Sequence, residues 1–300
     1  MAIASVRAQV NGTWYTLSYD SASGAYKGTI TAPGSTSFNR TGGYYDVTVE
    51  ATNTAGTKVT ANGSTLTSLQ LKVRETVKPV VKIMSPATGA FVTNNTERAV
   101  ILITDETGGS GINNAMLRVK LDGTPVSVST LEITQTTTGI RVDYNPATAL
   151  ADGQHTLTVD IEDNDGNAAE TATATFIVDT VPPTLNVTAP ANALVTNKSS
   201  LTVTGTTNDA TSSSVTVKVA VNGTDQGSVT VAANGSFSKA VTLSEGSNSL
   251  VVTATDAAGK VSTVTRSVTL DTSTPVVKSA SVTPNPVNTG ASVIISVVIE

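Results

Sequence analysis

Short segments in which apolar and polar residues alternate recur along the chain, separated by turn residues. The segment Val215–Val221 is the clearest example, with valine at every second position. A period of two places successive side chains on opposite faces of a β-strand. Residues that favour turns recur about every 8–12 residues, a spacing that is typical of a β-sandwich. No segment shows a comparable helical period, so the sequence predicts an all-β fold.

Two landmarks recur in the same order and indicate internal repeats of about 100 residues. The first is an acidic residue followed by Thr and, three positions after that, by Pro, at Glu75–Pro79, Asp179–Pro183 and Asp271–Pro275. Each copy joins the end of one strand to the start of another, and proline suits a short, semi-rigid linker there.

The second landmark is a hairpin dipeptide that follows an alternating strand. It occurs as Asn11-Gly12, Asp122-Gly123 and Asn222-Gly223. Asn-Gly and Asp-Gly favour the type I′ turn, in which both central residues need a positive φ. A later alternating strand in each repeat also ends in a glycine turn and is followed by a returning strand. Each repeat therefore has about seven short strands, the signature of a Greek-key sandwich.

These landmarks divide the chain into residues 1–75, 76–180, 181–271 and 272–300. The second and third repeats each open with two strands, at Val80–Pro86 and Val100–Thr104 and at Thr184–Pro190 and Leu201–Gly205. The first repeat lacks these two strands, whereas residues 272–300 resemble such an opening. The sequence predicts three tandem Greek-key β-sandwiches, the first completed by the C-terminal strands.

The segment Val293–Ile299 is almost entirely β-branched and uncharged, so it favours pairing with a sheet edge. We expect Val293, Ile295, Val297 and Ile299 to make the contacts. Three arrangements remain open at this point. The strands complete a first domain in another copy of the chain, or in the same chain, or they are the start of a truncated fourth domain. The partner predicted in the first two cases is the chain itself.

Composition narrows the function classes. There is no Cys and only one His, which excludes a Cys-based zinc site, a thiol nucleophile and a disulfide framework. The net charge of −5 provides nothing basic enough to hold a nucleic acid. No apolar run has the length of a membrane span, and the N-terminus lacks a recognisable signal peptide. We expect a non-enzymatic protein of the extracellular space.

Acidic residues concentrate in the second repeat and suggest a metal. Asp163 and Asp165 lie in a Gly-containing hairpin tip, and Asp105 and Glu106 precede a Gly-rich loop. Calcium is bound by six to eight oxygens, several of them from carboxylates. These four residues are the candidate Ca²⁺ ligands. The alternative is that the hairpin acids serve only the turn. No other cofactor is expected.

Aromatic residues cluster in the first repeat, where alternation separates them onto two faces. Tyr15, Leu17 and Tyr19 share the face expected in the core, which leaves Trp14 as a candidate surface contact for a sugar or a partner chain. His155 lies at the start of a strand, and no serine motif accompanies it as a catalytic triad would require. We expect His155 to be structural.

The third repeat resembles a bacterial Ig-like domain. The resemblance is carried by Pro182–Pro190, Leu201–Thr206, Val221–Gly223 and Asn248–Gly259, and the second repeat is similar. It implies tandem domains of the kind found in bacterial surface adhesins, in accessory modules of glycan-acting enzymes and in phage tail or virion proteins. The reading favoured here is a phage tail or virion array that binds other tail proteins or itself. The alternative is a cell-surface adhesin or carbohydrate-binding module whose partner is a cell-surface glycan.

Overall fold

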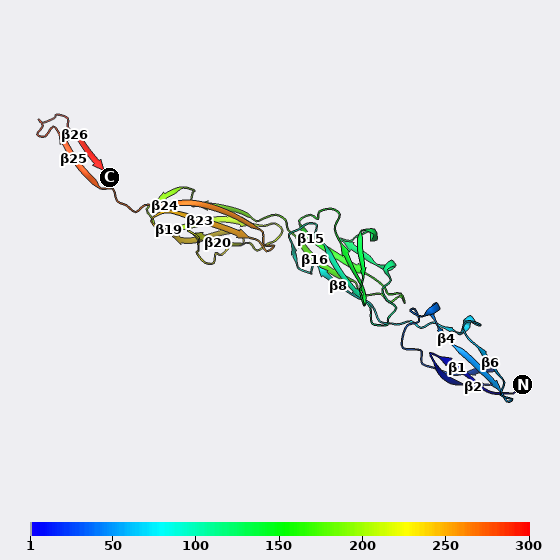
Figure 1. The fold of residues 1–300 in the computed structure, drawn as a ribbon. Coiled ribbons are helices and arrows are strands. Elements are labelled where there is room, and N and C mark those ends of the chain that lie inside the picture. Colours follow the sequence, from blue (N-terminus) through cyan, green and yellow to red (C-terminus); the bar gives the residue numbers. More distant parts are fainter. Residues whose placement is uncertain (1) are drawn as a thin grey trace. The chain divides into compact units, whose positions relative to one another are not determined.

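A computed structural model describes residues 2–300, and its regular secondary structure is almost entirely β-strand (Figure 1). Within this range the helical elements are four 3-10 turns, at Thr41–Gly43, Thr67–Leu69, Asn114–Met116 and Val128–Thr130. No helix of the described chain has both the length and the hydropathy to cross a bilayer. The chain divides into two compact units, Met1–Val178 and Asp179–Glu300. The all-β prediction is confirmed.

The second repeat folds as a sandwich of two sheets. One sheet has the strand order β13-β14-β10-β8 and the other the order β12-β11-β15-β16-β9. The strands are β8 (Val80–Ser85), β9 (Phe91–Val92), β10 (Ala99–Thr104), β11 (Arg118–Leu121), β12 (Thr124–Pro125), β13 (Leu131–Gln135), β14 (Gly139–Tyr144), β15 (Gly153–Asp160) and β16 (Ala172–Val178). The two strands expected to open this repeat, β8 and β10, pair antiparallel.

The core of this sandwich comes from alternate residues of both sheets. Ile101 and Ile103 of β10 are fully buried, as is Val159 of β15 in the opposite sheet. Phe176 and Val178 of β16 pack in the same cluster. Burying each of these side chains contributes about 1.5–3 kcal/mol. The period-two pattern in the sequence is therefore the pattern of contact between the sheets.

The third repeat forms a similar sandwich. Its sheets have the orders β17-β19-β22 and β18-β24-β23-β20-β21. The strands are β17 (Thr184–Ala189), β18 (Leu194–Thr196), β19 (Ser200–Asn208), β20 (Thr216–Val221), β21 (Thr224–Asp225), β22 (Ser236–Thr242), β23 (Gly246–Thr255) and β24 (Val261–Leu270). Val217, Val219 and Val221 are buried on one face of β20, as their alternation predicts.

The dipeptide hairpins form as expected. In all three repeats both residues of the dipeptide have positive φ, the backbone of a type I′ turn. Asn222, for example, has a φ of 49° and Gly223 a φ of 81°. The turn joins β1 to β2 in the first repeat, β11 to β12 in the second and β20 to β21 in the third. The dipeptide therefore forms the same turn in each of the three repeats.

The first repeat differs from the other two in its second layer. It has a five-stranded sheet of order β3-β2-β1-β5-β6 and a two-stranded sheet of β4 and β7. The strands are β1 (Ile3–Val10), β2 (Thr13–Asp20), β3 (Ala25–Lys27), β4 (Tyr45–Asp46), β5 (Thr48–Asn53), β6 (Lys58–Ala61) and β7 (Gln70–Leu71). Val6, Ala8, Val10 and Tyr45 are the buried hydrophobic residues of this domain.

Tyr19 does not lie in the core, contrary to the alternation in its strand. Its side chain is 59% exposed, whereas Tyr15 and Leu17 are partly buried. Tyr19 lies opposite Tyr26 of the short edge strand β3, and the two ring centroids are 5.3 Å apart. The alternation gave the correct face, but this end of β2 lies beside the sheet edge, where a ring packs on its neighbour rather than in a core.

The C-terminal residues form a hairpin of β25 (Val277–Thr283) and β26 (Ile294–Ile299). The two strands pair antiparallel, as β8 pairs with β10 and β17 with β19, and they constitute a two-stranded sheet of their own. Val293, Ile295, Val297 and Ile299 are 40%, 69%, 49% and 61% exposed. Completion of another domain by these strands stays a prediction.

A core substitution tests the sandwich of the second repeat. We expect Ile101→Ala to destabilise this domain by about 2–5 kcal/mol, because a fully buried side chain is replaced by a cavity. Val128→Ala is the control, since Val128 is 48% exposed in the same domain, and we expect it to change stability by less than about 0.5 kcal/mol. Urea unfolding of the full chain measures both, and similar losses in the two variants would contradict this core.

Candidate functional site at the start of each sandwich

Acidic residues gather where the second and third sandwiches begin. The acidic residue of the junction motif, Glu75 or Asp179, lies five residues before the start of the first strand of the following domain, β8 or β17. A second acidic residue, Asp105 or Asp209, comes directly after the strand that pairs with that first strand. Antiparallel pairing places the start of one strand beside the end of the other. The fold therefore brings both carboxylates to the same edge in each domain.

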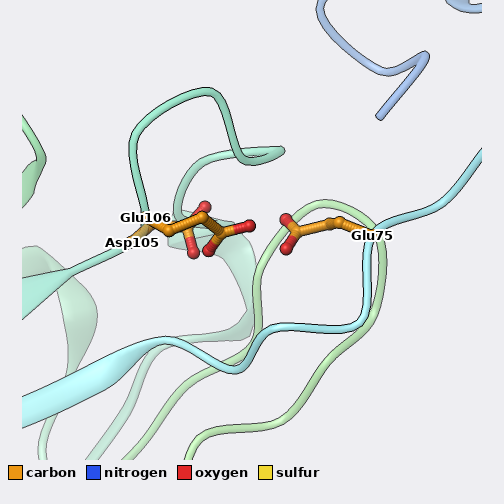
Figure 2. A group of neighbouring side chains, drawn as sticks. All are labelled: Glu75, Asp105 and Glu106. Carbon is orange, nitrogen blue, oxygen red and sulfur yellow. The ribbon is translucent and has the colours of Figure 1, made fainter. Parts of the chain in front are cut away.

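In the second domain, three carboxylates meet at this edge. One oxygen each from Glu75, Asp105 and Glu106 lies within 4.8 Å of the other two. Figure 2 shows Asp105 and Glu106 side by side on one segment, with the Glu75 carboxylate facing them from the junction. We refer to Glu75, Asp105 and Glu106 as the first acidic cluster.

The loop after β10 holds the first acidic cluster through backbone N–H groups. The N–H of Gly111 donates to Asp105 Oδ2 at 2.7 Å, and the N–H of Ser110 donates to Glu75 Oε1 at 2.7 Å. A Cβ at Gly109 would lie 2.7 Å from Asp105 Oδ2 and 2.7 Å from Glu106 Cδ. A side chain at this position would therefore displace the carboxylates from their present positions.

The pKa values in the first acidic cluster reflect crowded negative charge. Burial, together with the neighbouring carboxylates of Glu75 and Asp105, raises the pKa of Glu106 to about 8. Burial also acts to raise the pKa of Glu75, but hydrogen bonds from Glu106 and from the Ser110 N–H outweigh it, and that pKa is lowered.

Two of the four predicted metal ligands lie outside this cluster. Asp163 is fully buried, and its two oxygens accept hydrogen bonds from the backbone and side-chain nitrogens of Asn167 at 2.8 and 2.7 Å. Asp165 Oδ2 accepts from the Glu75 N–H at 3.0 Å and from the Thr36 hydroxyl. Both residues hold the hairpin tip and the junction in place, the turn role that was the alternative for them.

A second acidic cluster lies in the third domain, formed by Asp179, Asp209 and Asp256. One oxygen from each lies within 4.8 Å of the other two. Asp179 is fully buried and accepts a hydrogen bond from the Ser212 hydroxyl. Asp209 Oδ1 accepts from the Ser212 N–H at 2.6 Å, so Ser212 links the first two carboxylates.

The two clusters obtain their third carboxylate from different places. Asp256 is the equivalent of Asp163: each accepts the backbone N–H four residues later at 2.8 Å. In the second domain that later residue is Asn167, whose side chain also occupies the other oxygen of Asp163. The third domain has Lys260 there, which leaves Asp256 Oδ2 buried without a partner.

Sequence reasoning missed Glu75 and the whole second acidic cluster. The signal was present in the junction motif, whose acidic residue was interpreted only as part of a linker. Asp256 was overlooked because the tip that follows it, Ala257-Ala258-Gly259, is not acidic. The periodic recurrence of an acid before each proline was the observation that could have identified both clusters.

Trp14 lies on the outer face of the first domain, as expected. Its side chain is 37% exposed, and the guanidinium of Arg7 lies 4.2 Å from the ring centroid. Arg7 also donates to Glu50 Oε1 at 2.9 Å. Trp14 is thus part of a row of surface contacts across β2, β1 and β5.

His155 is held at both ring nitrogens. Nδ1 lies 2.7 Å from Asp122 Oδ2, and Nε2 lies 2.8 Å from the carbonyl oxygen of Ala151. Burial opposes the charged imidazole, but the two acceptors outweigh it and raise its pKa, while the pKa of Asp122 is lowered. A ring engaged in this way acts as a link between the turn and β15.

Asp122→Asn tests this link. Asn222 occupies the equivalent position in the third domain and makes the equivalent backbone contact, so the variant keeps the turn. A raised His pKa contributes stability below the ordinary value of about 6.5, and this is lost as pH rises through the folded pKa. We expect the variant to be less stable than the parent at pH 5.5 or so and equal to it well above the folded pKa. NMR titration of His155 checks the cause, and an unchanged His155 pKa in the variant would contradict the link.

Comparison with known proteins places these domains. Residues 88–180 match a family described as bacterial Ig-like domain, and residues 183–272 match glucodextranase, domain B. A search of curated proteins finds no significant match.

Solved structures with similarity include fibronectin(III)-like modules of Clostridium thermocellum CbhA, at 20% identity over 64% of this chain and 94% of that chain, with a TM-score of 0.39. Sidekick-1 immunoglobulin domains 1–5 match at 14% identity over 92% of this chain and 55% of that chain, with a TM-score of 0.40. A Bacteroides ovatus protein, SGBP-B, in complex with a mixed-linkage heptasaccharide, matches at 14% identity over 93% and 62%, with a TM-score of 0.23. The chain contains tandem β-sandwich domains, of which the second matches the bacterial Ig-like domain and the third matches domain B of glucodextranase.

Proposed function

We propose that this chain is a non-catalytic structural array that spaces or attaches components on the surface of a phage tail or virion. The observation that carries the proposal is the repetition of one sandwich together with its junction. At the start of the second and third domains the junction acid is bonded into the domain that follows it, Glu75 to the Ser110 N–H and Asp179 to the Ser212 hydroxyl. Such a join suits a protein that holds its parts at set distances.

The family matches support a non-enzymatic role. The bacterial Ig-like domain and the fibronectin-like neighbours are types of module that carry no catalysis, although glucodextranase domain B is part of an enzyme family. His155 has both ring nitrogens engaged with acceptors, which suits a structural residue. We therefore assign binding and spacing, rather than turnover, to the array.

The second candidate is a cell-surface adhesin or a carbohydrate-binding accessory module. Two observations favour it: the match of residues 183–272 to a domain of a glycan-acting enzyme, and the exposed ring of Trp14. An aromatic ring on a sheet surface can pack against the apolar face of a sugar. In this case the partner would be a glycan on a cell surface.

Antibodies against the chain separate these candidates. Immunogold electron microscopy of phage particles and of cells from the source culture shows where the protein resides. We expect label on purified particles, concentrated on the tail. Label on the cell envelope, together with a change in the fluorescence of the single Trp on adding glycans, would contradict the virion assignment and support the adhesin.

We further propose that the chain associates with a second copy of itself. The first domain has an open groove of ≈ 710 Å³ lined largely by apolar side chains, among them Val10, Leu17 and Ile30. The β25–β26 hairpin exposes Ile295 and Val297. A strand pair that adds to this groove would cover apolar surface on both partners.

Deletion of residues 276–300 tests self-association. We expect the full chain to form concentration-dependent oligomers by multi-angle light scattering, and the deleted chain to remain monomeric. The substitutions Ile295→Thr and Val297→Thr provide a milder version that keeps the hairpin. A full chain that stays monomeric at all concentrations would contradict donation to a second copy.

A further inference from the structure

The two acidic clusters hold carboxylate oxygens that nothing in the protein neutralises. Among residues 2–300, five buried side-chain N or O atoms have no hydrogen-bond partner, and four of them belong to the clusters. These four are Glu75 Oε2, Asp105 Oδ1, Glu106 Oε2 and Asp256 Oδ2. Buried polar atoms are almost always paired, and an unpaired charged one is costly. Their concentration at two equivalent places calls for a ligand.

One unpartnered oxygen in each cluster belongs to a side chain that is more than nine-tenths buried. Asp105 is 9% exposed and Asp256 is 5% exposed. Figure 2 shows the Asp105 carboxylate beside the Glu106 side chain, whose carboxylate extends toward Glu75. Among the described residues, no Lys, Arg or His forms an ion pair with any of the six cluster carboxylates. The charge inside each cluster is therefore uncompensated by the protein.

The spacing of the oxygens fits a calcium ion. Ca²⁺–oxygen distances of about 2.3–2.6 Å place two ligands of one ion at most about 5 Å apart. The three acidic ligand atoms of each cluster lie within 4.8 Å of one another. Mg²⁺, at about 2.1 Å, demands a stricter octahedral geometry than Ca²⁺. All the cluster side chains offer oxygen, the donor that both of these ions prefer.

The first acidic cluster is also open to water. Glu75 and Glu106 line a pocket of ≈ 410 Å³ together with residues of the junction. Calcium completes its six to eight ligands with backbone carbonyls and water molecules. In the third domain, Asp209 lines a pocket of ≈ 240 Å³. An ion can reach both clusters with part of its hydration shell in place.

We propose that each acidic cluster binds one Ca²⁺, with the junction acid as a ligand in both. Glu75 and Asp179 belong to the linkers, whereas the other four carboxylates belong to the sandwiches that follow. The bound ion therefore ties each linker to its domain. The third carboxylate comes from Glu106 in the second domain and from Asp256 in the third. A set of three carboxylates is therefore present in both domains, although the third residue lies at a different position in the fold.

Isothermal titration calorimetry of the full chain tests the proposal. The protein is stripped with EDTA, returned to chelator-free buffer and titrated with CaCl₂. We expect two ions per chain, with dissociation constants no weaker than about 10⁻³ M, as in extracellular calcium modules. The variants Glu106→Gln and Asp256→Asn should each remove one ion. Absence of binding up to about 10 mM calcium, ten times that constant, or two ions still bound by the double variant, would overturn the proposal.

Surface acids outside the clusters provide matched controls in both domains. Glu132→Gln removes a carboxylate that is 69% exposed in the second domain, and Asp225→Asn changes an exposed turn residue in the third. Both controls should bind two ions. Loss of an ion from either control would show that the variants act through net charge rather than through the clusters.

Thermal unfolding distinguishes ion binding from a purely structural role of the carboxylates. In EDTA, we expect Asp256→Asn to unfold at the same temperature as the parent or higher, because the amide removes repulsion and can donate to Asp179 or Asp209. In calcium, we expect the melting temperature of the parent to rise by about 4–8 °C for each kcal/mol of binding free energy. In the Asp256→Asn variant, we expect the third domain not to show this rise. If Asp256→Asn lowered the unfolding temperature by the same amount in EDTA and in calcium, the assignment of a calcium site would be contradicted.

Discussion

Packing of β-branched side chains between two sheets determines where the other features of this chain lie. Alternate residues of each strand, such as Ile101 and Val219, enter a dry core and fix which face of the strand is outward. Once the first two strands of a domain pair antiparallel, the start of one and the end of the other must meet at one edge. That edge also receives the linker from the preceding domain.

Negative charge accumulates at this edge in both complete sandwiches. A carboxylate on the linker faces a carboxylate on the strand end, and a third one closes the group. Repulsion among buried carboxylates would loosen the linker, whereas a shared cation would hold it. The proposed spacing function and the proposed calcium sites therefore depend on the same junction residues.

The sequence was sufficient for the repeats, the hairpins and the two opening strands of each complete domain, because these follow from local period and turn chemistry. It was insufficient where an outcome depends on residues distant in the chain. Tyr19 alternates like a core residue but lies beside a sheet edge. Asp163 resembles a metal ligand, yet Asn167 occupies both its oxygens, and the equivalent Asp256 is left unpaired because Lys260 replaces that asparagine. Neither difference can be recognised without the folded loop.

The proposed calcium ions would join the linker to the sandwich at the start of the second and third domains. X-ray diffraction from crystals grown in calcium, with data collected at a wavelength that enhances its anomalous signal, locates such ions directly. If each acidic cluster binds calcium, one anomalous peak lies between Glu75 and Asp105 and another between Asp179 and Asp256, each with carboxylate oxygens at about 2.3–2.6 Å. Well-ordered clusters without a peak at either place would contradict it.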